Sequence, residues 1–443
     1  MSRDVVIVDL GFGDQGKGTL TDFLVRDLGA RLVVRYNGGA QAAHRVVTDD
    51  GRRHVFAQLG AGSFVPGVQT FLSRFVAVCP WALAVEARHL ARAGVSDGLA
   101  RTWLSERAPL ITPFHGAANR IRERARGDAR HGSCGLGVGE TMADATTRDA
   151  ADVLRAADLD DPGLGAKLAR IQARKREELA PVIAAMTPDQ RAASADDLAR
   201  LSEPSLTLRL VHELASVRRE TRLAQDTDLR GLLDATPAAV FEGAQGVLLD
   251  ADFGFHPHTT WSNCTSAQAL ALRSEAGRDG LVTRLGVLRA YATRHGAGPF
   301  PTETPALVEH LPEPNDFGVM NPWQGDFRVG WFDAVTTRYA IDANGGIDAL
   351  AITCLDRVAD LPEWRLADAW EADGAVVTTL PLPRPGDLAA QTALGRLAAR
   401  ARPRYLTSPP AACLDVIERT VSPVALVSSG PCARDKRWRT RPE

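Results

Sequence analysis

The sequence predicts an α/β protein built on a large, mostly parallel central sheet surrounded by helices. Strand-like apolar runs alternate with helical stretches along most of the 443 residues. The first such run, residues 5–8, leads into a glycine-rich turn and then into a helix expected over 19–28. Several later apolar runs end in polar residues, and in parallel sheets ligands gather at the carboxyl ends of strands.

The other expected elements are strands, one long helical region and a loop. Strands are expected at 31–36, 238–241, 349–353 and 424–428, with a further apolar run at 71–78 and a helix at 81–94. Residues 150–230 are rich in Ala, Arg, Asp and Glu, which predicts a helical insertion punctuated by Pro181 and Pro204. Residues 376–388 hold three prolines and are expected to form a loop. We therefore expect a single domain over 1–443, with a helical subdomain at 150–230.

Composition excludes several classes of function. The net charge of −2 argues against broad binding to nucleic acid or to a membrane surface. No apolar run reaches the length of a bilayer span. The six cysteines lack CxxC spacing, which indicates reduced thiols without a zinc framework and a cytoplasmic protein.

The turn at 11–18 reads Gly-Phe-Gly-Asp-Gln-Gly-Lys-Gly and predicts a phosphate site. Glycines let backbone N–H groups approach an anion, the following helix directs its positive end there, and Lys17 adds a full charge. The spacing is close to that of a P-loop, but Gly18 replaces the hydroxyl that binds magnesium. Asp14 is unusual, since an acid beside a phosphate requires a metal ion or a proton transfer.

A second glycine turn, residues 36–44, also follows a strand and ends at His44. The position of this histidine after Gly38-Gly39 fits a catalytic role and an ordinary surface residue equally well.

From these two segments onward the chain resembles adenylosuccinate synthetase. The family opens with G-x-W-G-D-E-G-K-G and Y-x-G-G-x-N-A-G-H, which stand here as 11–18 and 36–44. Later segments with the same order and likeness are Phe241-Glu242-Gly243-Ala244-Gln245-Gly246, residues 257–263, residues 290–303 and Ser428-Ser429-Gly430-Pro431. The resemblance implies the P-loop-related fold of that family and a GTP-dependent ligase acting with Mg²⁺. Such an enzyme phosphorylates the 6-oxo group of IMP and replaces the phosphate with an amine.

The resemblance also implies a role for each matching residue. Asp14 would be the general base and, with Ala43, a magnesium ligand; His44 would be the acid at the transferred phosphoryl group; Lys17 would neutralise phosphate oxygens. The residues implied for GTP are Gly13, Gln15, Gly16, Lys17, Gly18, Asp356, Ser428 and Gly430. Those implied for the acceptor nucleotide are Gln41, Ser133, Cys134, Arg148, Gln245 and Thr260, with Gln245 at the oxo group. Arg148 would reach the site of a partner subunit in a homodimer.

Two sites depart from the family pattern. In the guanine pocket Asp356 remains to accept two hydrogen bonds from the base, but Cys354 replaces a lysine. In the loop for aspartate only Arg328 remains of an arginine run, and Leu136 replaces a further arginine. The loss of two arginines removes about 3–6 kcal/mol, or roughly 10²–10⁴ in affinity. We therefore expect an amine other than aspartate bound in the family's way, held by a loop that includes Val319, Asn321, Trp323, Phe327 and Arg328.

Three other interpretations stay open at the level of sequence. Authentic adenylosuccinate synthetase activity is the conservative one. Substitutions at residues 133, 134, 136 and 354 also fit a non-catalytic relative that binds guanine nucleotides. A GTP-dependent kinase or amide ligase acting on a non-purine substrate is the third. For the loop, the alternative is that Trp323 and Phe327 serve only to pack it.

Overall fold

A computed structural model describes residues 3–278, 280–311, 323 and 325–442 of the chain. Within these residues the central sheet has ten strands, and all neighbours in it are parallel except its two C-terminal strands, β17 and β18, which are antiparallel. This confirms the predicted fold class. In spatial order the strands are β18 (Lys436–Trp438), β17 (Val424–Ser428), β13 (Ala349–Thr353), β9 (Leu281–Arg289), β1 (Arg3–Asp9), β8 (Ala239–Glu242), β2 (Leu32–Arg35), β5 (Gln69–Leu72), β6 (Thr102–Ser105) and β7 (Arg222–Ala224).

Strand β1 explains why the sequence shows a continuous apolar run at its start. Val6 and Val8 pack into a core on one face of the sheet, whereas Val5 and Ile7 pack into a core on the other. A parallel strand covered on both faces has no solvent side, so its residues do not alternate between apolar and polar. The helix α1 (Lys17–Leu28) contributes Leu20, Leu24 and Val25 to the second of these cores.

The topology places β8, far away in the chain, between β1 and β2. Val5 lies opposite Val240 in the sheet, and Val33 lies opposite Val240 from the other side. The carboxyl ends of β1, β8 and β2 therefore meet at one edge, where the turns at 11–18, 36–44 and 243–246 follow them. The residues that the sequence motifs single out therefore lie together at this edge.

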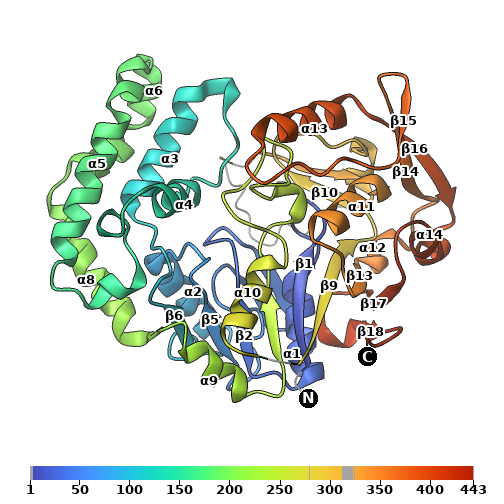
Figure 1. Ribbon diagram of the computed structural model, residues 1–443, viewed down its shortest axis with the longest axis horizontal. Coiled ribbons are helices and arrows are strands. Elements are labelled where there is room, and N and C mark those ends of the chain that lie inside the picture. The colour runs from blue at the N-terminus through green and yellow to red at the C-terminus, as the bar shows by residue number, and fades with distance from the viewer. Residues whose placement is uncertain (1–2, 279, 312–322, 324, 443) are drawn as a thin grey trace.

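The region 150–230 is helical, apart from the three-residue strand β7. It holds α5 (Leu164–Ala185), α6 (Pro188–Ala193), α7 (Ala195–Ser202), α8 (Ser205–Glu220) and the start of α9 (Asp228–Asp234). Together with α3 (Pro113–Arg126) and α4 (Val138–Thr147), α5–α8 form the arm on the left of Figure 1. Pro204 precedes α8, whereas Pro181 lies inside α5 rather than at a helix boundary. The described residues contain no helix that is long and apolar enough to cross a membrane.

The elements that follow residue 330 lie mainly to the right in Figure 1. A small second sheet consists of β12 (Phe332–Asp333), β14 (Trp364–Ala372), β15 (Ala375–Val377) and β16 (Arg402–Ser408). Two antiparallel pairs complete the strands: β3 (His44–Val47) with β4 (Arg53–Phe56), and β10 (Ala292–His295) with β11 (Phe327–Gly330). The other helices are α2 (Pro80–Arg92), α10 (Ala267–Glu275), α11 (Ala334–Ala343), α12 (Leu355–Val358), α13 (Leu388–Arg400) and α14 (Cys413–Thr420).

Candidate active site

The glycine-rich turn connects the end of β1 to the start of α1. Gly13 and Gly16 have φ of 92° and 93°, and Asp14 has φ of 61°. Glycine adopts this left-handed conformation readily, whereas a side chain there is strained, and such strain concentrates at functional positions. The position of Asp14 is therefore a structural indication, independent of any motif, that this residue acts in the site.

The inner side of the turn is filled by the carboxylate of Asp9, the last residue of β1. It accepts hydrogen bonds from the backbone N–H of Gly11 at 2.9 Å, of Gly13 at 3.3 Å and of Gln15 at 3.3 Å. The ammonium group of Lys17 lies 2.5 Å from the same carboxylate. Burial raises the pKa of Asp9, and Lys17 and the Gly11 N–H oppose that rise. The sequence motifs gave no role to Asp9.

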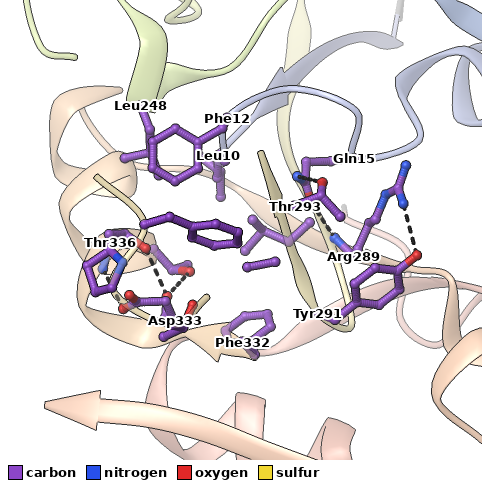
Figure 2. Close-up of a pocket in the computed structure, with 17 residues that line it drawn as sticks. Leu10, Phe12, Gln15, Leu248, Arg289, Tyr291, Thr293, Phe332, Asp333 and Thr336 are labelled. Carbon is purple, nitrogen blue, oxygen red and sulfur yellow. Dashed lines mark hydrogen bonds between the residues drawn. The ribbon is translucent and has the colours of Figure 1, made fainter. Parts of the chain in front are cut away.

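The side chain of Gln15 is directed into the protein. Its amide donates to the carbonyl of Gly13 at 2.7 Å and accepts from the backbone N–H of Arg289 at 2.7 Å. Figure 2 shows Gln15 beside Thr293 and Arg289, at the edge of a small cavity of about 30 Å³ beneath the turn. Gln15 thus ties the turn to the end of β9, so any contact with GTP would come from its backbone.

His44 begins β3 and is held by a partner on β8. Its Nδ1 lies 2.6 Å from Oε1 of Glu242, and Oε2 of the same carboxylate accepts from the N–H of Ala61 at 2.9 Å. Burial lowers the pKa of His44 to about 4, although Glu242 acts in the opposite direction. Glu242 is fully buried, and nearby Arg35 and His44 outweigh the effect of burial and lower its pKa. The imidazole is therefore fixed through Nδ1, with Nε2 as its second nitrogen.

Asp14 pairs with a residue to which the motifs gave no role. Nε2 of His295, at the end of β10, lies 3.1 Å from Oδ2 of Asp14. Burial by itself would raise the pKa of Asp14, but the hydrogen bond and charge of His295, with Arg289 and Lys17, lower it. At neutral pH this carboxyl group is ionised, as a proton acceptor must be.

These residues open onto a cavity of about 610 Å³ between the sheet edge and the helical arm. Its lining includes Asp14, Lys17, Gln41, Ala43, His44, Ser133, Cys134, Arg148, Gln245, Thr260 and His295. The structure thus brings together the predicted catalytic residues and the predicted acceptor residues. Both amide atoms of Gln245 and the Oε1 of Gln41 are buried and have no hydrogen-bond partner among the described residues. Unpaired buried amides are costly, which indicates that a polar ligand completes these two side chains.

On the arm side of the cavity, the turn before α4 carries Ser133 and Cys134. The Ser133 hydroxyl exchanges hydrogen bonds with Asn119 at 2.9 and 3.1 Å. Arg148 caps the end of α4 and is exposed, and its guanidinium lies 2.8 Å from Glu178. In a single subunit this arginine is thus paired within its own arm.

The predicted guanine residues lie outside this cavity, at the ends of β13 and β17. Asp356 is exposed on α12, and Cys354 before it has φ of 58°. Ser428 ends β17 and donates to the carbonyl of Gly430 at 3.1 Å. These strands are parallel neighbours in the sheet, so their carboxyl ends form one surface beside the start of α1. The hydroxyl of Thr19 on α1 donates to the carbonyl of Pro431 there.

The described part of the predicted amine loop packs against both sides of the site. Val319 and Asn321 lie outside the described residues. The guanidinium of Arg124 stacks 4.8 Å from the ring of Trp323, and the ring of Phe327 lies 4.8 Å from that of His295.

At least four of the five N–H donors of the Arg328 guanidinium have partners in its own chain. Its guanidinium pairs with the carboxylate of Glu303 and donates to the carbonyls of Gly296 at 3.0 Å and Gly298 at 2.9 Å. A carboxylate ligand that binds through two N–H groups would have to displace at least one of these partners.

The oxygen donors near Asp14 suit a magnesium ion. Asp14 and Ala43 both line the cavity, and a carboxylate and a backbone carbonyl are ligands that Mg²⁺ accepts alongside phosphate oxygens and water. The described residues contain no group of three or more His, Cys, Asp or Glu placed to hold a metal. A magnesium ion here would thus depend on nucleotide phosphates for part of its coordination.

Comparisons with known proteins identify the family of the chain. The profile of the adenylosuccinate synthetase family matches residues 6–394. Adenylosuccinate synthetase 2 of Chromobacterium violaceum is 34% identical over 384 residues, which cover 86% of this chain and 83% of that protein. The enzyme of Photobacterium profundum is 33% identical over 444 residues, 97% of each chain. The chain therefore belongs to the adenylosuccinate synthetase family, a family of GTP-dependent carbon–nitrogen ligases, which confirms the recognition made from the motifs.

Solved structures confirm the fold over nearly the whole chain. The fully ligated adenylosuccinate synthetase of Plasmodium falciparum superposes with a TM-score of 0.76 at 20% identity, covering 98% of this chain and 99% of that one. The succinoaminodeoxyadenylate synthetase PurZ of cyanophage S-2L, solved with dGMP and with dATP as an energy donor, gives a TM-score of 0.60 at 18% identity. It covers 99% of this chain and 95% of that one.

Proposed function

We propose that this protein transfers the γ-phosphoryl group of GTP to the oxo group of an IMP-like purine nucleotide and then replaces that phosphate with an amine. The observation that carries the proposal is the convergence of Asp14, His44 and Gln245 on one cavity. The unpaired amide of Gln245 offers one donor and one acceptor, which match the lactam edge of a 6-oxopurine.

Each residue has a task in this reaction. Asp14 accepts the proton from N1 of the purine, which makes O6 nucleophilic, and O6 then attacks the γ-phosphorus while GDP leaves. Lys17 stabilises the charge on the transferred phosphoryl group, and His44 does so in its protonated form, which Glu242 and the negative phosphoryl oxygens favour. The amine nitrogen then attacks C6, and the C6–O bond breaks so that its electron pair leaves with the phosphate. The nitrogen gives up a proton. Mg²⁺ held by Asp14 and the carbonyl of Ala43 would neutralise phosphate oxygens.

The amine is proposed to be something other than aspartate bound in the family's way. Arg328 is occupied by Glu303 and two carbonyl oxygens, and Leu136 offers no charge. Trp323 and Phe327 add aromatic surface beside His295 and the turn before α4. An amine with one carboxylate, or with none, fits such a site better than a dicarboxylate.

The test is phosphate release by the purified protein, with GTP, IMP and a panel of amines that includes aspartate, glycine, ammonia and a diamine. We expect turnover to require both IMP and an amine. The kcat/KM for aspartate is expected to be at least about 10²-fold lower than that for the best amine that is not a dicarboxylate. Asp14→Asn is the matched inactive control. Aspartate as the best amine would identify an authentic adenylosuccinate synthetase. GTP binding without turnover on any acceptor would favour a binding protein, and parallel assays with ATP and dATP test the choice of donor.

The homodimer remains part of the proposal, because Arg148 is exposed at the end of α4 and lines the cavity. Sedimentation analysis at micromolar concentration tests it. A cytoplasmic location likewise stays a prediction.

A further inference from the structure

The turn that resembles a P-loop already contains an anion of its own. In an anion-binding turn the backbone N–H groups point at the ligand. Here the N–H groups of Gly11, Gly13 and Gln15 point at the carboxylate of Asp9 instead. The side chains of Asp9 and Lys17 are 1% and 3% exposed, and their charged atoms lie 2.5 Å apart.

We propose that Asp9 is a positioning residue that neutralises Lys17 and competes with the donor phosphates for it, which keeps nucleotide affinity low. This inference rests on the proposed function. Lys17 lines the large cavity as well as contacting Asp9, so a bound triphosphate and Asp9 both lie within reach of the same ammonium group. With Asp9 ionised, the pair carries no net charge toward an arriving phosphate. The same neutralisation helps the diphosphate product to leave.

The two oxygens of Asp9 separate the roles of the residue. Oδ1 accepts from the N–H groups of Gly11 and Gly13, whereas Oδ2 accepts from Gln15 and from Lys17. Asparagine can keep Oδ1 for the first two donors and places an NH₂ group at the second position. Asp9→Asn therefore preserves half of the hold on the turn while it removes the charge and releases Lys17.

Binding measured by calorimetry tests the inference, with GTP, GDP and guanosine titrated into the full chain. We expect Asp9→Asn to bind GTP about tenfold or more tightly than the wild type, the factor that one charged hydrogen bond represents, while guanosine affinity is unchanged. The gain is expected to vanish in a Lys17→Met background. Asp4→Asn is the matched control, because Asp4 is a buried acid at the other end of β1 that pairs with Arg273 and Arg278. That variant is expected to leave GTP affinity unchanged.

Unchanged or weaker GTP binding by a folded Asp9→Asn protein overturns the inference, as does a gain that survives without Lys17. If Asp9→Asn does not fold, a crystal structure of the wild type with GTP decides: Lys17 bound to a phosphate supports the inference, and Lys17 bound only to Asp9 overturns it. Failure of the proposed function is distinct, because it is seen as missing phosphate release in the turnover assay, whereas this test measures GTP affinity alone.

Discussion

The substitution Glu242→Gln tests whether the orientation of His44 supports phosphoryl transfer. In the native protein Oε2 of Glu242 accepts from Ala61 and Oε1 lies 2.6 Å from Nδ1 of His44. Glutamine would keep its oxygen for the Ala61 N–H and turn its NH₂ toward Nδ1. Nδ1 must then act as an acceptor, which reverses the tautomer of the imidazole and removes the negative charge that would stabilise its protonated form.

The magnitude follows from the contact that is lost. A hydrogen bond to a charged group contributes about 1.5–3 kcal/mol, which corresponds to a decrease in kcat of roughly 10- to 150-fold. Because Glu242 does not line the cavity, the affinity for GTP is expected to change by less than about threefold. Steady-state kinetics together with calorimetric titration of GTP separate the two effects. Glu86→Gln is the control, since Glu86 is also a buried glutamate that accepts backbone N–H groups, those of residues 57–59. A kcat within about threefold of the wild type, or a loss seen in GTP affinity alone, would refute the reasoning.

Three further predictions concern other parts of the chain. Asp14→Ala is expected to lower kcat by about 10²–10⁴, the range for a lost acid or base, and a decrease below about tenfold in a phosphate-release assay would contradict its role. Arg148→Leu is expected to weaken the binding of the acceptor nucleotide more than the binding of GTP. Equal Kd values for the acceptor in the wild type and the variant would exclude a phosphate contact. Burial raises the pKa of Glu86 to about 7 in the folded protein, so the wild type loses stability relative to Glu86→Gln as the pH rises from 4.5 to 7. In denaturant titrations, the difference in unfolding free energy between the wild type and Glu86→Gln is expected to change by about 3 kcal/mol between the two pH values. A difference that does not depend on pH would contradict the raised pKa.

The sequence predicts those elements whose signals are local. The apolar runs 349–353 and 424–428 coincide with β13 and β17 as the structure has them, and the helix after the glycine turn ends where expected, at Leu28. Burial on both faces makes these strands continuous apolar runs, and glycine turns mark their ends. Pro181 shows the limit of local reasoning, because α5 continues through it. The apolar run 71–78 likewise yields only the end of β5, at Leu72.

The site could be predicted only as far as its motifs extend. Asp14, His44 and Gln245 stand in recognisable segments, but the residues that orient or occupy them come from distant parts of the sheet. Glu242 reaches His44 because β8 lies between β1 and β2, an order that strand patterns do not encode.

Arg328 shows how the same limit affects a functional conclusion. By resemblance to the family it is the one arginine that remains of a carboxylate-binding run. The pairing of β10 with β11 places Arg328 opposite Arg294 and brings its guanidinium to Glu303 and to the carbonyls of Gly296 and Gly298. An arginine with these partners can bind a substrate carboxylate through two N–H groups only by giving up at least one of them, so its retention in the sequence is a weak argument for aspartate. The ion pair between Arg328 and Glu303 is therefore a second reason, beside the lost arginines, for the proposal of an amine other than aspartate.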